Sequence, residues 1–342
     1  MVTIKDVARD AGVSVGTVSN VLNGGRVSEA RRKLVEASIE KLGYQVNTLA
    51  KGMRMQKTDY VVVILPNLIN PYFALLLDAL ENELSAVGKQ VLLCLSGDDA
   101  EREVAFMDMA KQNKVDGIIG VTYSKVEEER IENMAFVSID RHYKSHIPCV
   151  AGDNWQGGWL AAENLHKRGA TNLLCFMTMS SVDSEVRKRR VGFTEYCMEH
   201  DLSCNSVEMS EKQIVSVYES YGSRKLIHNM LRAYISPSMG EHSIDGIFTS
   251  SDHLATIVRE ELEEMGKRVP EDIQIIGYDG LQFLNQGKPI VSSIAQPVHE
   301  IAKEAVRCLN ELIANGKTEG NTKIPVSFQE GPTTKTLVTE EK

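Results

Sequence analysis

The chain has 342 residues, of which 42% are apolar and 25% charged, and its six cysteines include no C-x-x-C pair. This length favours two or more domains, and the composition is typical of a globular protein with reduced thiols, which excludes a disulfide framework or a zinc site. No apolar run approaches the roughly 20 residues that span a bilayer, and the charged N-terminus is unlike a secretory signal, so we expect a cytoplasmic protein.

Charge is distributed unevenly along the chain. The net charge of −9 combines a basic beginning with an acidic remainder. Residues 1–57 carry ten Lys/Arg against five Asp/Glu, and the other residues carry 28 against 42. A small basic module ahead of a large acidic body indicates an N-terminal head that binds a polyanion.

The first 43 residues predict three short helices separated by tight breaks. Thr3 is expected to cap the first helix and Gly12 to end it, because hydroxyl side chains favour helix starts and glycine favours helix ends. Ser14 is expected to cap the second helix, and Ser28 and Gly43 to bound the third. The inward apolar positions recur at helical spacing: Ile4, Val7, Ala8 and Ala11, then Val18, Val21 and Leu22, then Leu34, Val35, Ile39 and Leu42. Three helices with a turn between the first two predict a helix-turn-helix unit.

The second predicted helix is the one expected to read DNA. In a helix-turn-helix unit it enters the major groove by its N-terminal residues, because the groove is just wide enough for one helix. Outward-facing Val15 can pack on a thymine methyl and Asn20 can bond an adenine edge, with Gly16 between them. A three-helix interaction domain is the alternative, which the charge, the caps and the turn disfavour. The residues expected to hold phosphates are Thr17, Ser19, Arg26 and Arg31.

Residues 3–47, TIKDVARDAGVSVGTVSNVLNGGRVSEARRKLVEASIEKLGYQVN, resemble the N-terminus of the lactose-repressor (LacI/GalR) family of bacterial transcription regulators. The resemblance implies a DNA-binding domain over residues 1–46 and a hinge over residues 47–57. It also implies that the hinge folds into a minor-groove helix when two copies pair on DNA. The residues expected to contact DNA are Thr3, Ser14, Val15, Gly16, Thr17, Ser19, Asn20, Asn23, Arg26, Arg31, Tyr44, Asn47, Lys51, Met53 and Arg54.

The expected hinge is short, basic and contains two methionines. Ten residues form a helix only about 15 Å long, and helices of that length are marginal in water, so folding coupled to DNA binding is the physically reasonable route. The family usually has proline, arginine and leucine where this chain has Val46, Lys51 and Met53. Met53 is expected to insert between central base pairs as an apolar wedge, whereas Met55 is expected to pack on the first strand of the body.

From residue 60 onward, apolar strands alternate with amphipathic helices. Expected strands are YVVVIL, QVLLCL, GIIGV, AFVSI, CVAGD, NLLCFM, GIFTS and QIIGYD, and expected helices lie near residues 71–87, 100–113, 156–168, 185–200, 222–235 and 252–266. About 280 residues of such alternation predict an α/β body with two parallel sheets, helices on both faces of each, and a cleft between them. We expect residues 58–342 to form this effector-binding and dimerisation body. Its N-subdomain is expected over about 58–155 and 297–322, and its C-subdomain over about 156–295 and 323–340.

Polar and aromatic residues follow several expected strands, where ligands of open α/β sheets bind. Arginine and carboxylates beside aromatic faces suit a polyhydroxylated ligand, since hydroxyls both donate and accept hydrogen bonds. The set resembles the effector domain of the same family, which is similar to periplasmic sugar-binding proteins. The resemblance implies sugar contacts from Asn70, Tyr72, Phe73, Asp140, Arg141, Arg189, Asp279 and Gln296, with Ser251 where an asparagine is usual.

A neutral monosaccharide or close derivative is the effector that these residues favour. Asp183 stands where the purine-responsive relative has an arginine, which disfavours a nucleobase. A nucleobase or a protein corepressor remains the alternative. Asp153 and Asp252 are expected to be structural, supporting a crossover strand and a helix N-terminus.

An enzyme is the competing class of protein. The chain has no G-x-G-x-x-G after a strand, and NGKT at residues 315–318 lacks the first glycine of a P-loop, where Glu311 stands. It also has no Asp-Gly-Thr phosphate loop of the sugar-kinase type. His142 and His146 are four residues apart in an expected loop, so solvated side chains are favoured over a metal site. A transport-type sugar-binding protein would share the body but not the basic head. No catalytic residue, metal or cofactor is expected.

These features predict a homodimeric repressor on a near-palindromic operator, because two-fold protein symmetry maps onto two-fold DNA. An effector between the subdomains is expected to change the spacing of the two hinges. The C-terminal residues GPTTKTLVTEEK lack a leucine heptad array, so a coiled-coil tetramer is not expected.

Overall fold

Two units make up the chain, Met1–Thr58 (the head) and Asp59–Lys342 (the body). The structure is a computed structural model that describes residues 2–22, 24–44, 58–125, 127, 130–131, 133–143, 147–179, 182–210, 213–214, 216–217, 224–235, 243–282, 286–318 and 320–337. Among these residues, no helix combines the length and the apolar character needed to span a bilayer.

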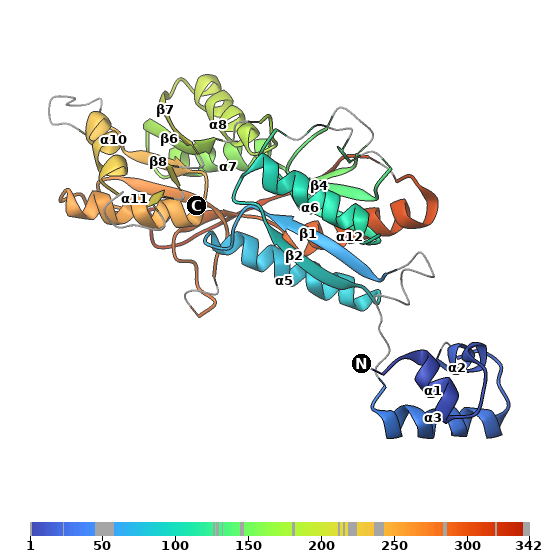
Figure 1. Cartoon of the computed structure of the whole chain (residues 1–342). Helices are drawn as coiled ribbons and strands as arrows, with labels where there is room; N and C mark the ends of the chain where they lie inside the picture. Colours follow the sequence, from blue (N-terminus) through green and yellow to red (C-terminus); the bar gives the residue numbers. More distant parts are fainter. Residues whose placement is uncertain are drawn as a thin grey trace, which may run out of the picture. The chain divides into compact units, whose positions relative to one another are not determined.

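The head contains helices α1 (Ile4–Asp10), α2 (Val15–Leu22) and α3 (Glu29–Leu42), as Figure 1 shows. These three helices confirm the predicted helix-turn-helix unit. The predicted hinge at residues 47–57 lies outside the described residues.

Local hydrogen bonds explain where the helices of the head begin and end. The Asp6 carboxylate accepts bonds from the backbone N–H and the hydroxyl of Thr3, at 2.9 and 2.6 Å, which closes the first turn of α1. The Ser14 hydroxyl accepts from a backbone N–H in the first turn of α2 at 3.1 Å. Ser28 lies at the N-cap of α3 but makes no side-chain cap bond to the described residues, and Gly43 ends α3 with φ +62°.

A small apolar core holds the head together. Its buried members are Val7, Ala8, Val18, Val21 and Val35. Leu34, which helical spacing predicts to face inward, is 55% exposed, so that prediction is wrong. Two short helices cover only a narrow face of the longer α3, and Leu34 lies outside that face. Asp10 links α1 to α3 by accepting bonds from Lys41 Nζ, at 2.7 Å, and from the Ser38 hydroxyl.

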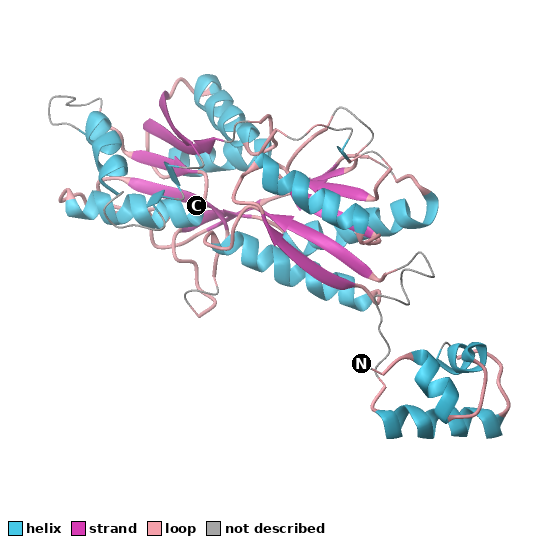
Figure 2. Ribbon diagram, viewed as in Figure 1, coloured by secondary structure: helices cyan, strands magenta, loops and turns pink. Residues whose placement is uncertain are grey.

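The body contains two sheets, each with six described strands (Figures 1 and 2). The first sheet has the order β11 (Thr322–Ile324), β5 (Cys149–Gly152), β4 (Phe136–Ile139), β3 (Gly117–Val121), β1 (Tyr60–Leu65) and β2 (Gln90–Leu95). The second has the order β12 (Ser327–Gln329), β10 (Ser292–Ala295), β9 (Gln274–Asp279), β8 (Gly246–Thr249), β6 (Asn172–Met179) and β7 (Ser203–Ser210). The described neighbours pair in parallel except β10 with β12. This arrangement confirms the predicted α/β body.

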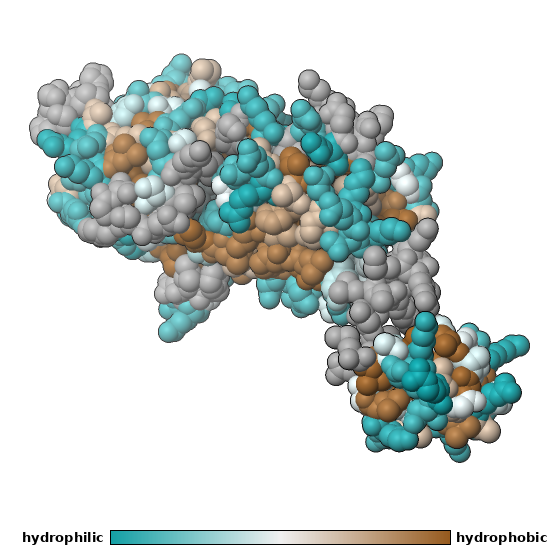
Figure 3. All heavy atoms as spheres, in the orientation of Figure 1, coloured by the Kyte–Doolittle hydropathy of each residue, from teal (hydrophilic) through white to brown (hydrophobic). Residues whose placement is uncertain are grey.

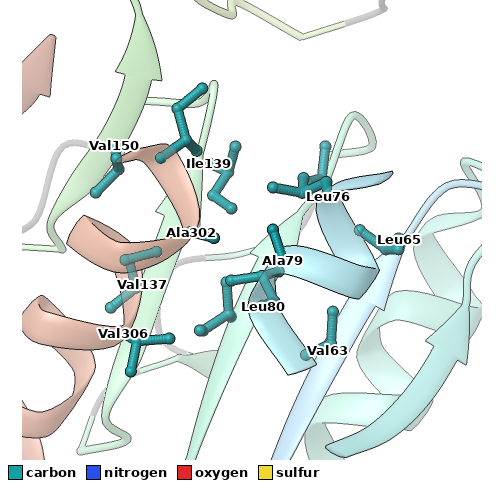
Figure 4. Packing of buried hydrophobic residues seen from close by; sticks show 14 of the residues in the cluster. Val63, Leu65, Leu76, Ala79, Leu80, Val137, Ile139, Val150, Ala302 and Val306 are labelled. Carbon is teal, nitrogen blue, oxygen red and sulfur yellow. The ribbon is translucent and has the colours of Figure 1, made fainter. Parts of the chain in front are cut away.

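Helices cover both faces of the first sheet, and together they form the N-subdomain. Helices α5 (Pro71–Ala86) and α12 (Val298–Asn315) pack on one face, and α6 (Ala100–Gln112) packs on the other. Burying each large aliphatic side chain contributes about 1.5–3 kcal/mol, so these clusters dominate the stability of the subdomain. Figure 4 shows the first cluster, in which Leu76, Ala79, Leu80, Ala302 and Val306 of the helices meet Val63, Leu65, Val137, Ile139 and Val150 of the strands.

The second sheet is covered in the same way and forms the C-subdomain. Helices α7 (Asn154–Lys167) and α8 (Arg187–Glu199) pack on one face. Helices α10 (Lys225–Ile235) and α11 (Asp252–Glu264) pack on the opposite face. Alternate residues of the buried central strands point to the two faces, which is why these strands are apolar throughout.

Three described segments connect the subdomains, between β5 and α7, β10 and α12, and β11 and β12. Strand β11 pairs with β5 of the first sheet, so the expected boundary at residue 322 falls inside a strand, and we extend the N-subdomain to Ile324. Strands β7, β10, β11 and β12 and helix α12 were not among the predicted elements. These connections bring the carboxyl ends of strands from both sheets to one place.

Candidate functional site

A cavity lies where the carboxyl ends of strands from both subdomains meet. The space within it is about 750 Å³, a figure that includes open solvent. Eight predicted ligand residues line it, namely Asn70, Tyr72, Phe73, Asp140, Arg189, Ser251, Asp279 and Gln296. They come from segments between residues 70 and 296, so the fold assembles the cavity from distant parts of the chain.

Arg189 supplies the buried positive charge of the cavity. Its side chain extends from the first turn of α8, and the residue is 4% exposed. Its Nε donates to Asn154 Oδ1 at 2.6 Å, and its Nη1 donates to the Ser250 carbonyl at 2.7 Å. The guanidinium carbon lies 3.5 Å from the ring centre of Tyr278. Two hydrogen bonds and a ring contact hold this group in one orientation, which suits binding of a polar ligand.

Two carboxylates, Asp140 and Asp279, lie on either side of this charge, one from each subdomain. Burial raises the pKa of Asp140 to about 6 and that of Asp279 to about 7, and the nearby Arg189 limits both increases. Both residues have positive φ, +60° and +126°, immediately after β4 and at the end of β9. Such strained, buried acids are typical of binding sites rather than of stabilising cores.

The cavity contains free hydrogen-bonding atoms. Asp279 Oδ1 accepts from Gln296 Nε2 at 2.9 Å. Asp279 Oδ2, Gln296 Oε1 and the Tyr72 hydroxyl are buried without a partner among the described residues. Burial also raises the pKa of Tyr72, so its hydroxyl stays neutral and can donate. Unsatisfied buried polar atoms are costly, so these three atoms indicate where a ligand binds.

A close contact between α7 and α8 positions Arg189. A Cβ on Gly158 would lie 1.8 Å from the Arg189 carbonyl oxygen, and a Cβ on Gly192 would lie 2.0 Å from the Trp155 carbonyl oxygen. Only glycine fits at either position. The backbones of α7 and α8 are therefore in direct contact, and this contact sets the position of Arg189.

Arg141 is not among the residues that line the cavity, so its ligand contact stays a prediction. Its Nη1 donates to the Ser124 carbonyl at 2.6 Å and to Thr122 Oγ1 at 3.3 Å. Its guanidinium also lies 4.4 Å from the ring centre of Tyr143. Asp140 thus lines the cavity, while the bonds that Arg141 makes lie within the N-subdomain.

Three other polar residues near the cavity have structural roles, and two of them cap helices. The Ser251 hydroxyl accepts from the backbone N–H of Leu254 at 3.1 Å, so it caps α11 while lining the cavity. Asp153 Oδ1 accepts from the backbone N–H of Gln156 at 3.0 Å and so caps α7. Asp252 accepts from the Ser293 hydroxyl at 2.6 Å and from the backbone N–H of Leu281 at 2.7 Å. Asp153 and Asp252 are thus structural, as expected, although the Asp252 carboxylate bonds β10 and the segment after β9 and not the start of α11.

Several lining residues had not been predicted. They include Asn67, Thr178, Met179, Ser184, Arg187 and Ser250. Their place depends on loop paths that no local pattern specifies. Asn154, which accepts a hydrogen bond from Arg189, lies two residues after β5, and its place near a strand end was its only signal in the sequence.

The predicted DNA-contacting residues of the head are largely accessible. Val15 is 37% exposed, and Gly16 and Asn20 are exposed beside it on α2. The Ser14 and Thr17 hydroxyls bond each other at 3.0 Å. Thr3, Arg26 and Arg31 are exposed, while Ser19 and Tyr44 are half-buried. Asn23, Asn47, Lys51, Met53 and Arg54 lie outside the described residues, as do Val46, Met55 and His146.

Comparison with known proteins shows what this combination of head and body is. The model of bacterial regulatory proteins of the lacI family matches residues 3–47, and the model of the periplasmic binding protein-like domain matches residues 162–334. The sucrose operon repressor of Pediococcus pentosaceus is 33% identical over 332 residues, 96% of this chain and 98% of that protein. The chain belongs to the LacI family. It is therefore a sequence-specific DNA-binding regulator of transcription with a head and an effector-type body.

Other LacI-family proteins agree along most of the chain. The ribose operon repressor of Halalkalibacterium halodurans is 32% identical, covering 90% of this chain and 89% of that protein. A regulator from Alkaliphilus metalliredigens QYMF complexed with D-xylulofuranose is 26% identical over 81% of this chain and all of that chain, with a TM-score of 0.69. The Lac repressor dimer bound to operator and the anti-inducer ONPF, 22% identical, shares the fold with a TM-score of 0.79 over 97% of this chain and 98% of that one.

Proposed function

We propose that the protein is a repressor that binds a near-palindromic operator as a homodimer and is controlled by a neutral monosaccharide, or a close derivative, in the body cavity. The observation that supports the effector class is a buried guanidinium between two buried carboxylates, with free acceptor atoms on Asp279 and Gln296. Sugar hydroxyls donate and accept, so they match these acceptors and Arg189 together. Relatives named sucrose and ribose operon repressors support the same class.

The head is the proposed operator-reading part. We assign DNA binding to residues 1–46, a hinge to residues 47–57, and effector binding and dimerisation to residues 58–342. Val15, Gly16 and Asn20 are the proposed base-reading residues, since they are exposed on one short helix. Because the DNA is a polyanion, the excess of Lys/Arg in residues 1–57 favours binding.

The proposed homodimer uses the face of the body that carries α5 and β2. Figure 3 shows apolar side chains gathered there, and Leu68, Ile69, Val87 and Leu93 are exposed in that part of the chain. Strand β2 is also an edge strand of its sheet. An apolar patch beside an open edge favours association. Leu93→Glu should shift the chain toward monomer in analytical ultracentrifugation, and an unchanged dimer would place the interface elsewhere.

A thermal-shift screen of the full chain tests the effector class. The panel holds pentoses, hexoses, sugar phosphates, disaccharides and nucleobases. A ligand present at about 100 times its Kd adds roughly 2.7 kcal/mol to the free energy of unfolding, which raises Tm by several degrees. A single neutral monosaccharide is the expected hit, and a hit from a nucleobase alone would contradict the proposal.

A nucleobase effector is the second candidate, because a relative named PurR from Aliivibrio salmonicida is 29% identical over 92% of this chain. Asp183 stands where that effector class is expected to need an arginine. The buried carboxylates of Asp140 and Asp279 line the cavity as hydrogen-bond acceptors, which favours a ligand with hydroxyl donors.

The hinge has its own test. Met53→Ala should reduce operator bending if Met53 inserts between base pairs, and unchanged bending would exclude that role.

As for the class of protein, we propose a cytoplasmic regulator without enzymatic activity, which the family membership supports.

A further inference from the structure

Glu185 is a buried carboxylate next to the cavity but not part of its lining. It is 1% exposed and lies between β6 and α8, in the C-subdomain. Its neighbours Ser184 and Val186 line the cavity. A carboxylate this deeply buried is costly unless cations and donors compensate it.

The groups that compensate Glu185 come mainly from the other subdomain. Its Oε1 bonds His142 Nε2, which follows β4 of the N-subdomain, and Lys188 Nζ of its own α8. Its Oε2 lies 4.0 Å from Nζ of Lys323, on β11 of the N-subdomain. Its backbone N–H donates to the Asp140 carbonyl at 2.8 Å. Two side chains of the N-subdomain, His142 and Lys323, therefore meet the Glu185 carboxylate, and the Asp140 carbonyl of the N-subdomain meets its backbone N–H.

These contacts exist only while the subdomains are close at this point. Val186, the next residue, packs against the apolar core of the N-subdomain. Separating the subdomains would remove His142 and Lys323 from Glu185 and would expose the carboxylate to water. The contacts with His142 and Lys323 thus form only in the closed arrangement, whereas the ion pair with Lys188 lies within the C-subdomain.

The cluster also reaches the cavity through the backbone. The bond from Glu185 N–H holds the Asp140 carbonyl, and Asp140 keeps a left-handed backbone with its carboxylate on the cavity. On the other side, Arg189 extends from the same helix that begins at Arg187. Glu185 is therefore bonded to the backbone of Asp140 and lies four residues before Arg189 in the chain, without lining the cavity itself.

We propose that Glu185, with His142 and Lys323, forms an inter-subdomain lock that holds the body closed without effector and thereby sets effector affinity. Glu185 is a positioning residue in this scheme. The claim that these residues favour closure is based on the contacts alone. The claim that closure sets effector affinity rests on the function proposed above. A ligand that needs the closed body binds more tightly when closure is already favoured.

The test compares two carboxylate variants in the full chain. Glu185→Gln keeps the size of the side chain and removes its charge. The matched control is Asp116→Asn, because Asp116 is equally buried in a 2.7 Å ion pair with Lys89, but both partners belong to the N-subdomain. Spin labels on an unnatural amino acid at exposed positions Gln112 and Met198, one in each subdomain, report the inter-subdomain distance. Dilution with unlabelled chain removes distances between protomers.

Without ligand, Glu185→Gln should lengthen the distance between labels at 112 and 198 or broaden its distribution. It should also weaken the affinity for the sugar that raises Tm by about three- to tenfold. Asp116→Asn should leave both readouts unchanged. His142→Gln should act like Glu185→Gln, and the double variant should add little, since the two residues share one interaction. An unchanged distance in Glu185→Gln, or an equal change in Asp116→Asn, overturns the lock. A changed distance with no sugar binding in the native chain would keep the lock and refute the proposed effector instead.

Discussion

The head and the cavity of the body place their functional groups in opposite environments. In the head, Val15, Gly16 and Asn20 are exposed on a helix whose inner face alone is buried. In the body, Asp140, Arg189 and Asp279 are each at most 4% exposed. A functional group in water costs the fold little, whereas a buried charge depends on its partners. Substitutions of the base-reading residues should therefore change the free energy of unfolding little. Substitutions of the buried charges in the cavity should change both the free energy of unfolding and effector binding.

Removing the charge of Arg189 should give the largest effect and sharpen this contrast. Arg189→Met leaves two buried carboxylates without their cation, which should lower the free energy of unfolding by about 3–5 kcal/mol and abolish effector binding. Chemical denaturation of the full chain measures the loss. Arg190→Met is the matched control on the same helix, since Arg190 is 39% exposed with Glu208 as its partner, and it should change stability by less than about 1 kcal/mol. Equal losses in both variants would contradict the account.

Asn20→Ala tests the other side of the comparison. It should weaken specific operator binding by about 1–3 kcal/mol for each half-site, because a base contact is lost. The free energy of unfolding should change by no more than about 0.5 kcal/mol, as for other surface substitutions. Titration of operator and of random DNA separates base reading from phosphate contacts. A variant that loses both kinds of binding equally would exclude base reading by Asn20.

Gly158→Ala probes how the cavity is positioned. The added methyl would meet the Arg189 carbonyl at 1.8 Å, so α8 must move, at a cost of about 1–3 kcal/mol. Effector affinity should fall although residue 158 contacts no ligand, and calorimetry measures that fall. Gly320→Ala is the control, because a Cβ there meets no described atom within 4 Å and should be tolerated. Native affinity in Gly158→Ala would show that the helix contact does not position Arg189.

Asp279→Asn should change the free energy of unfolding in the opposite direction. The pKa of Asp279 is raised to about 7 in the folded protein, whereas an unfolded aspartate ionises near pH 4. The folded state therefore holds a proton that the unfolded state has lost, so this group makes the native chain less stable as pH rises from about 4 to 7. At pH 7.5 the variant should be more stable by about 1 kcal/mol or more and bind effector poorly. A variant less stable than the native chain at that pH would contradict this reading.

The sequence allowed good prediction of the head because its signals are local. Thr3, Ser14, Gly12 and Gly43 mark helix ends through their own hydrogen bonds and backbone angles, so their neighbours decide little. Leu34 was mispredicted because helical spacing does not say how much of a helix its partners cover. The hinge residues remain untested predictions.

The body was predictable as a class and less so in detail. Buried central strands such as β1 and β9 are apolar throughout, whereas the edge strand β7 is polar and half-exposed, so it lacked a hydrophobic signal. In the cavity, the family resemblance found eight lining residues. The ligand contact of Arg141 stays a prediction, and Glu185 was missed because its partners His142 and Lys323 are distant in sequence.

The most direct test of the central claim is operator affinity of the full chain with and without the neutral sugar that raises its Tm. The account predicts at least a fivefold change in operator affinity, absent in Asp279→Asn, which should fold but bind the sugar poorly. The same operator affinity with the cavity empty and saturated would contradict it, as would full sugar response in Asp279→Asn.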